Sequence, residues 1–121
     1  MATCHAELIC WQLADQLRQL IIDRTREGSH AARDDRFTKN LRDAVSSACR
    51  NQSEGFYKFR HSEMRPFFNI ARGSLGETLD GIREGQQRGY FASKEADEMT
   101  DLCRRAMVAN LRFLLALKRP D

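Results

Sequence analysis

The sequence has few of the residues that build β-sheets, and its 121 residues include only two valines, Val45 and Val108. Proline is equally scarce, with Pro66 and Pro120 as its only occurrences. Strands need β-branched runs with turn residues between them, and this chain offers neither. The composition therefore argues against a fold built on β-sheet.

The chain also lacks the signals of membrane insertion, export and metal binding by cysteine. No uncharged run approaches the length of about 20 residues that a membrane span requires, and no basic-then-apolar leader follows Met1. No CxxC pair occurs among the four cysteines, Cys4, Cys10, Cys49 and Cys103, so neither zinc-site nor disulfide-framework spacing is present. Free thiols without an export signal favour the cytoplasm, and we expect no membrane partner.

Leucine, arginine, alanine, glutamate and glutamine, all good helix formers, dominate the composition. Hydrophobic residues make up 41% of the chain and charged residues 31%, a balance typical of a globular rather than a disordered protein. No internal repeat, low-complexity tract or linker divides the sequence. We therefore predict a single domain over residues 1–121.

Four segments carry apolar residues at alternating spacings of three and four, which is typical of amphipathic helices. The first covers about residues 6–26 and the second about residues 35–52, before Gly55 interrupts. The third begins near Ser62 as N-cap and ends at Gly89 as C-terminal cap, and the fourth is capped by Ser93 and extends through Leu117. Short connections force neighbouring helices to be antiparallel, so we predict an all-α, up-down-up-down four-helix bundle.

Each predicted helix has one line of residues expected to face the core. In chain order these lines are Ala6, Cys10, Leu13, Leu17 and Leu20; Phe37, Leu41, Ala44 and Ala48; Met64, Phe68, Ala71, Leu75, Thr78 and Ile82; and Met99, Leu102, Cys103, Ala106, Phe113, Leu114 and Leu117.

The fourth helix is more apolar than a lone bundle needs. Between residues 106 and 117 its only polar positions are Asn110 and Arg112. A helix that is apolar nearly all round is buried on more than one side, which here requires a second chain. The alternative is a wide core stripe with scattered exposed apolar side chains. The candidate oligomer interface consists of Trp11, Met107, Val108, Leu111 and Leu115.

The third helix carries four glycines in its interior, Gly73, Gly76, Gly81 and Gly85. Each costs roughly 1 kcal/mol relative to alanine, or about 4 kcal/mol in total. A cost of this size indicates close backbone approach by a neighbouring helix or chain. A kinked or frayed third helix would explain the same residues.

No constellation of residues indicates catalysis or a metal centre. Cys4, His5 and Cys10 are close in sequence, but the first two lie in a terminus that we expect to fray. His30 and His61 lie in loops without paired spacing, and no two predicted helices carry the Glu-x-x-His motif that a di-iron bundle needs. We therefore expect no metal, no cofactor and no enzymatic activity.

Nucleophilic and acid–base sites are equally unsupported. Residues 73–76 are glycine-rich but lie within a helix and lack the P-loop lysine. Carboxylates on one face of the third helix could mimic an acid–base pair, but Arg83 and Arg88 are near enough to pair with them. These carboxylates, which we interpret as solvated surface charge, are Glu77, Asp80 and Glu84.

Arginine supplies sixteen of the twenty basic residues, although the net charge is only +3. Arg105, Arg112 and Arg119 recur every seven residues and line one face of the fourth helix, with Ala109 and Ala116 between them. Repeated around a ring, such a line would attract a phosphate backbone. Alternatively, these basic residues complement the helix dipole and acidic neighbours, such as Asp101 at i,i+4 from Arg105. The candidate nucleic-acid-binding residues are Arg36, Lys39, Arg42, Arg50, Arg65, Arg72, Arg105, Arg112 and Arg119.

Several short motifs resemble those of the four-helix bundle proteins encoded by intervening sequences within bacterial large-subunit ribosomal RNA genes. The typical Val-Trp-Gln start of the first helix reads Cys-Trp-Gln at residues 10–12, and the Ser-Asn-Ile-Ala-Glu-Gly-Phe stretch corresponds to residues 50–56. The pattern Ile-Ala-x-Gly-Ser-Leu-x-Glu fits residues 70–77 position by position, and a Gly-Tyr pair follows at residues 89–90. Departures from the pattern include Cys49 in place of a proline and Gln52 in place of an apolar residue.

This resemblance covers about residues 9–117 and implies a homo-oligomer, typically a pentameric ring, without established enzymatic activity. More distant relatives, the accessory variability-determinant proteins of diversity-generating retroelements, bind nucleic acid and a reverse transcriptase. The resemblance implies structural roles for the motif glycines in backbone approach or turns, and for Asn51 and Glu54 in capping or inter-helix hydrogen bonds. The matching motif residues are Asn51, Glu54, Gly55, Phe56, Gly73, Ser74 and Leu75.

Two hypotheses about function follow from the sequence. The first is a non-catalytic, ring-forming bundle that binds RNA, DNA or a nucleic-acid enzyme through arginine-rich surfaces. The second is a structural or protein-interaction assembly whose arginines pair internally across subunits. An enzyme is a distant third, which would require a buried carboxylate pair or a bound metal.

Overall fold

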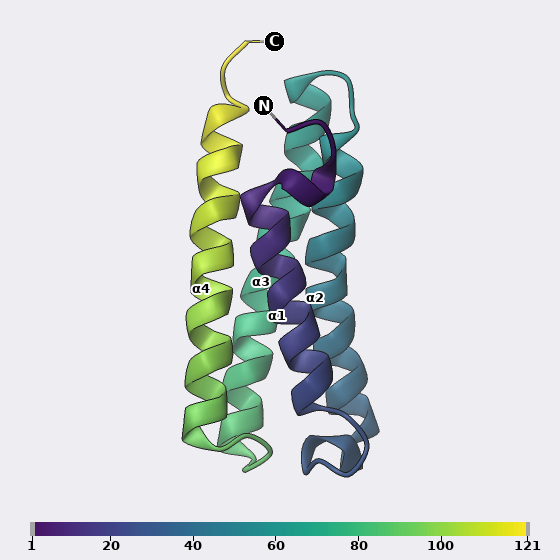
Figure 1. The fold of residues 1–121 in the computed structure, drawn as a ribbon, viewed down its shortest axis with the longest axis vertical. Coiled ribbons are helices and arrows are strands. Elements are labelled where there is room, and N and C mark those ends of the chain that lie inside the picture. Colours follow the sequence, from purple (N-terminus) through teal and green to yellow (C-terminus); the bar gives the residue numbers. More distant parts are fainter. Residues whose placement is uncertain (1, 121) are drawn as a thin grey trace.

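The computed structural model describes residues 2–120, and this part of the chain forms four long helices and no strand. Each helix packs beside the next one along the chain, and the last returns to pack beside the first. The predicted all-α, up-down four-helix bundle is therefore confirmed (Figure 1). The elements are η1 (His5–Glu7), α1 (Ile9–Arg24), η2 (Ala31–Arg33), α2 (Asp35–Phe56), α3 (His61–Gln87) and α4 (Ser93–Ala116).

The two ends of the bundle differ in what they contain (Figure 1). One end carries the α1–α2 connection and the tight turn between α3 and α4. The other end carries the α2–α3 turn together with both chain termini. None of the helices in the described part of the chain combines the length and the apolarity that crossing a membrane would need.

The predicted core lines of α2 and α3 are confirmed in full. Every residue of these two lines is buried, and Val45 and Cys49 widen the line on α2. In α4 the predicted line is also buried, except that Leu102 and Phe113 are half-buried and Asn110 joins it. The 3.6-residue period therefore located most of the core.

The core line of α1 differs from the prediction by a small rotation of the helix. Its central residues are Cys10, Ala14, Leu17 and Ile21, while Leu13 and Leu20 lie half-buried at its edge. Ala6 is exposed because Leu8 adopts an extended backbone and α1 begins only after it. The rotation arises because α1 packs between α2 and α4, so a band wider than a single line is covered.

The helix ends are set by local hydrogen bonds. The Asp34 carboxylate caps α2, since its Oδ1 accepts a hydrogen bond from Phe37 N at 3.0 Å. Its Oδ2 accepts one from the Tyr90 hydroxyl at 2.7 Å, and this bond is the main reason that the pKa of Asp34 lies below its ordinary value. At the end of α3, Gly89 adopts a left-handed φ of 79°, and Tyr90 N donates to Gly85 O at 2.8 Å. This is a Schellman motif, so the predicted cap at Gly89 is confirmed.

Two predicted N-caps were displaced by one or two residues. α3 begins at His61 with Arg60 as N-cap, so Ser62 lies inside the helix. α4 begins at Ser93 itself, and Ala92 is the N-cap residue. The Glu95 carboxylate accepts a hydrogen bond from Ala92 N at 2.9 Å, which satisfies the first free amide without a hydroxyl cap.

The segment before α1 packs against the bundle instead of fraying. The His5 ring lies edge-on to Trp11, with 4.8 Å between ring centroids. His5 N donates a hydrogen bond to the Tyr57 hydroxyl at 3.2 Å, and His5 Nδ1 lies 3.0 Å from the same oxygen. The N-terminal segment is therefore connected to the end of α2.

Candidate functional site

The nine basic residues of the candidate nucleic-acid surface divide by exposure. Arg42 and Arg65 are half-buried. The exposed members are Arg36, Lys39, Arg50, Arg72, Arg105, Arg112 and Arg119.

Arg42 and Arg65 are engaged with the C-terminal ends of neighbouring helices. Arg42 Nε donates to Thr25 Oγ1 at 2.8 Å, and its Nη2 donates to Ile22 O at 3.3 Å. Arg65 Nη1 donates to Leu117 O at the end of α4. The last carbonyls of a helix lack intrahelical partners, so both guanidinium groups satisfy backbone acceptors. These contacts give both arginines a structural role.

Several of the exposed basic residues form no ion pair within the described part of the chain. Lys39 Nζ lies 2.9 Å from Asp43 Oδ2, and Arg105 lies 4.0 Å from Asp101. In contrast, no carboxylate among residues 2–120 lies within 4.0 Å of the guanidinium groups of four arginines. These four are Arg36, Arg50, Arg72 and Arg112.

The fold separates the exposed basic residues. Arg36, Lys39 and Arg50 lie on α2, whereas Arg105 and Arg112 lie on α4. α2 packs on α1 and α3, and α4 packs on the same two helices, so α2 and α4 occupy opposite corners of the bundle. Their outer faces therefore point in different directions, and the chain does not combine the predicted residues into a single patch.

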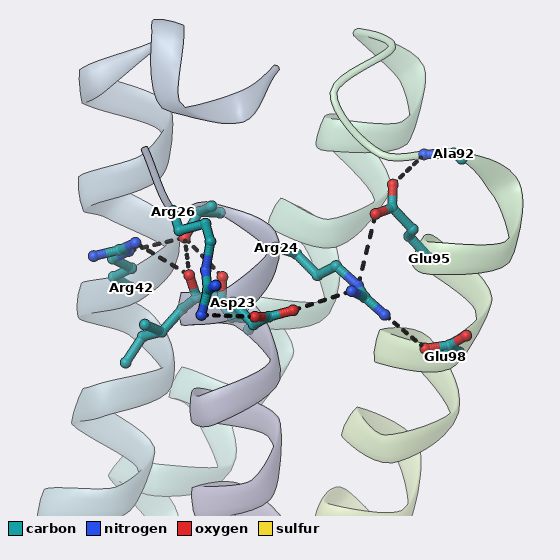
Figure 2. Close-up of polar contacts among 10 residues, drawn as sticks. Asp23, Arg24, Arg26, Arg42, Ala92, Glu95 and Glu98 are labelled. Atoms are coloured by element: carbon teal, nitrogen blue, oxygen red, sulfur yellow. Dashed lines mark hydrogen bonds and ion pairs between the residues drawn. The ribbon is translucent and has the colours of Figure 1, made fainter. Parts of the chain in front are cut away.

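Arg24, which the sequence reasoning did not select, is the most densely paired arginine in the described chain. Figure 2 shows its guanidinium between Asp23 on α1 and two glutamates on α4. It lies 3.1 Å from Asp23 Oδ2, 3.1 Å from Glu98 Oε2 and 3.7 Å from Glu95 Oε2. The sequence showed the acidic residues at the start of α4, but it did not indicate that Arg24 of α1 pairs with them. This cluster joins the end of α1 to the start of α4.

The outer face of α4 carries a stripe of exposed apolar side chains. Val108, Leu111 and Leu115 are spaced three and four residues apart, and they are 50%, 36% and 52% exposed. The other two residues of the candidate interface, Met107 and Trp11, are half-buried and pack on the core. The exposed part of that interface is therefore the line of these three residues, which we call the α4 stripe.

A shallow apolar groove runs beside the α4 stripe, between α4 and α1. Ile9, which is 68% exposed, forms one wall. Ala109 and Ala116 leave space on the opposite wall, and Arg112 borders the groove. The small residues between the arginines of α4 thus produce a depression next to a charged edge.

The motif residues that the resemblance singled out lie mainly where α2 meets α3. A Cβ atom on Gly55 would lie 2.7 Å from Phe67 Cβ, so only glycine permits this approach of the two helices. Ser74 Oγ lies 2.8 Å from Ser47 Oγ across the same interface, and Leu75 is fully buried. Asn51 donates hydrogen bonds to Ser47 within α2. Phe56 is half-buried, whereas Glu54 and Gly73 are exposed.

A buried amide pair connects all four helices. Asn110 Nδ2 on α4 donates to Gln52 Oε1 on α2 at 2.9 Å and to Phe68 O on α3 at 3.3 Å. Gln52 Nε2 in turn donates to Cys10 O on α1 at 3.3 Å. Both side chains are fully buried. The sequence signal for this pair was the polar Gln52 at a position where the related pattern has an apolar residue.

Three of the four cysteines are buried and poorly suited to nucleophilic or metal chemistry. Burial raises the pKa of Cys10 and Cys49 to about 11 and that of Cys103 to about 12. Their thiols are therefore protonated at neutral pH, and the thiolate is the reactive form. Within residues 2–120, no three His, Cys, Asp or Glu side chains are grouped so that they could hold a metal ion.

The carboxylates of α3 form no isolated acid–base pair. Glu77, Asp80 and Glu84 line a groove between α2 and α3. Glu84 Oε2 lies 3.4 Å from Arg88 Nε, which is the pairing expected from the sequence, although Arg83 does not take part. Solvated, partly neutralised carboxylates of this kind give no support to catalysis.

Comparison with known proteins identifies the fold family. No curated protein sequence matches the chain significantly. The family model of the 23S rRNA-intervening sequence proteins matches residues 6–109, a range that includes all of α1, α2 and α3 and most of α4. Since this match spans most of the chain and agrees with the four-helix architecture, the protein belongs to the 23S rRNA-intervening sequence protein family.

Proposed function

We propose that this protein is a non-catalytic homo-oligomer, arranged as a ring of five subunits, that binds nucleic acid or a nucleic-acid enzyme through its exposed arginines. The observation that carries the proposal is the α4 stripe, because Val108, Leu111 and Leu115 expose apolar surface along one helix face. Contiguous exposed apolar patches mark interaction sites. A second copy of the chain covers this surface in a symmetric assembly.

The exposed arginines supply the nucleic-acid part of the proposal. Arg112 lacks a carboxylate partner among residues 2–120 and borders the groove beside the α4 stripe. Assembly through this face would bring one Arg105 and one Arg112 from every subunit to the borders of the subunit contacts. Such repeated positive charge attracts a phosphate backbone, although one subunit alone offers no continuous patch.

A salt titration of nucleic-acid binding tests this proposal. We expect the purified protein to retain labelled RNA or DNA at low salt, with affinity that falls steeply as salt rises. Arg112→Ala is expected to reduce the slope of log affinity against log salt by about one, as expected for a lost phosphate contact. Arg83→Ala is the matched control, because Arg83 is an exposed arginine outside the candidate set, and it should leave the slope unchanged.

Absence of binding at low salt, or binding that is insensitive to salt, would refute the nucleic-acid part. The charge reversal Arg112→Glu distinguishes nucleic-acid binding from the alternative function, in which the arginines pair across subunits. If it changes the oligomer mass measured by light scattering without affecting nucleic-acid retention, the arginines pair across subunits. The protein would in that case be a structural or protein-interaction assembly.

A further inference from the structure

The turn between α2 and α3 alternates aromatic and basic residues in the order Tyr57, Lys58, Phe59 and Arg60. Phe59 is 95% exposed and Tyr57 is 60% exposed, so neither ring contributes its full surface to the core. Burial of the Phe59 ring by a ligand would therefore be favourable. We call this turn the 57–60 loop.

Contacts of Tyr57 and Lys58, the two residues before Phe59, anchor the start of the 57–60 loop. The Tyr57 hydroxyl accepts a hydrogen bond from His5 N at 3.2 Å. Lys58 folds back over α3, where its Nζ lies 5.0 Å from the centroid of the Phe67 ring. With its two preceding neighbours held in this way, Phe59 points outward on a preorganised turn.

The C-terminal end of α4, which carries further basic residues, lies close to the 57–60 loop. His61 Nδ1 lies 2.9 Å from Arg119 O, and Arg65 donates to Leu117 O, so the C-terminal end of α4 adjoins the loop. This places Arg119 and the neighbouring Lys118 at the same end of the bundle, which also contains the α2–α3 turn in Figure 1. Glu54 and Glu63 flank the loop in sequence. Yet no carboxylate in the described part of the chain lies within 4.0 Å of the Lys58 or Arg60 side-chain nitrogens.

We propose that the 57–60 loop is a binding site for single-stranded nucleic acid, in which Phe59 stacks on an unpaired base and Arg60 contacts the adjoining phosphate. This inference rests on the proposed nucleic-acid function and adds a site outside the arginine set considered above. Aromatic side chains beside basic groups bind single strands because every base offers a π-face to the ring. In a duplex the base faces are already stacked on one another, so a ring reaches them only at the cost of unstacking a base step.

The charges favour this ligand over a protein surface. Lys58 and Arg60, the two residues that flank the exposed ring in sequence, are both basic, and a nucleic-acid strand carries a negative phosphate beside every base. The α4 stripe, in contrast, consists of aliphatic residues on a helix face. The two exposed apolar surfaces therefore differ in chemistry, and only the 57–60 loop combines an aromatic ring with adjacent positive charge.

The test compares a fluorescently labelled single-stranded oligothymidylate with a duplex of equal length, by anisotropy at low salt. We expect Phe59→Ala to weaken single-strand binding by about 5- to 150-fold, the range for loss of one stacked base. Duplex binding should not change. Phe59→Trp should retain single-strand binding, since a larger ring preserves stacking. Ile70→Ala is the matched control, because Ile70 is an exposed apolar residue, 53% exposed, outside the loop.

Three other outcomes would contradict the inference, and they can be told apart. If Phe59→Ala binds the single strand as tightly as the wild type, the loop site is wrong while the proposed function stands. If the wild type binds neither nucleic acid, both proposals fail. If Phe59→Ala lowers the oligomer mass in light scattering, the ring packs against a second copy of the chain and not against a base.

Discussion

Gly85 and Gly73 both lie in α3, but their surroundings differ. A Cβ atom on Gly85 would lie 2.8 Å from Phe37 Cζ and still closer to the Phe91 ring. Around Gly73, no atom outside its own helical backbone and its chain neighbours lies within 4 Å of an added Cβ. At Gly81 and Gly85 the atoms that approach α3 thus belong to side chains of Leu41, Phe37 and Phe91, whereas Gly73 and Gly76 have open space.

These surroundings predict opposite effects for the same substitution. Gly85→Ala should lower the free energy of unfolding by about 1–3 kcal/mol, because the packed aromatic rings must shift. Gly73→Ala should raise it by up to about 1 kcal/mol, because alanine has the higher helix propensity. Urea denaturation at equal protein concentration measures both changes. Destabilisation by Gly73→Ala would indicate instead that another subunit approaches α3 there.

At the scale of the helices, the pairing depends on a few polar contacts inside an apolar interface. Gln52 and Asn110 connect α2 to α4 across the bundle, and their remaining hydrogen bonds reach backbone carbonyls of α1 and α3. A buried amide without its partner is costly, whereas removing both partners together is not. This pair therefore favours one arrangement of the four helices over others.

We expect Asn110→Leu to lower the free energy of unfolding by about 1–3 kcal/mol, because Gln52 Oε1 loses its donor in the core. The double variant Gln52→Leu with Asn110→Leu should lose less than the sum of the two single variants. A double-mutant cycle by urea denaturation measures this coupling. Simple additivity would show that the amide pair contributes nothing beyond its separate side chains.

At the scale of the whole molecule, the α4 stripe predicts the assembly state. Wild-type protein should have a mass several times the 14.0 kDa of one chain, and five times that mass for a pentamer. Leu111→Glu combined with Leu115→Glu should reduce the mass to that of a single chain, because charge in the contact opposes burial. Light scattering with size-exclusion chromatography measures the change.

Ile70→Glu provides the control for this assembly experiment, since Ile70 is a similarly exposed apolar residue on α3. It should leave the mass unchanged. A wild-type protein that remains a single chain at high concentration would contradict the assembly, and with it the ring in the proposed function.

The sequence determined the secondary structure and much of the core. The spacing of Phe37, Leu41 and Ala44 on α2 and of Phe68, Leu75 and Ile82 on α3 identified buried faces correctly, because helical periodicity is a local property of the chain. The candidate surfaces were less accessible to such reasoning. A guanidinium that caps a neighbouring helix, such as that of Arg65, has the same sequence pattern as one that faces water.

The sequence by itself therefore determined that there are four amphipathic helices and approximately where each one lies, although α2 continues through Gly55 to Phe56 instead of ending before it. It also determined that α4 carries more apolar surface than its core line needs. Only the tertiary structure decided that Arg24 and Arg42 join helices, that Gly85 is enclosed while Gly73 is open, and that the arginines of α2 and α4 face apart. The physical reason is that periodicity specifies which side of a helix is buried. Which neighbour covers that side depends on the packing of all four helices together.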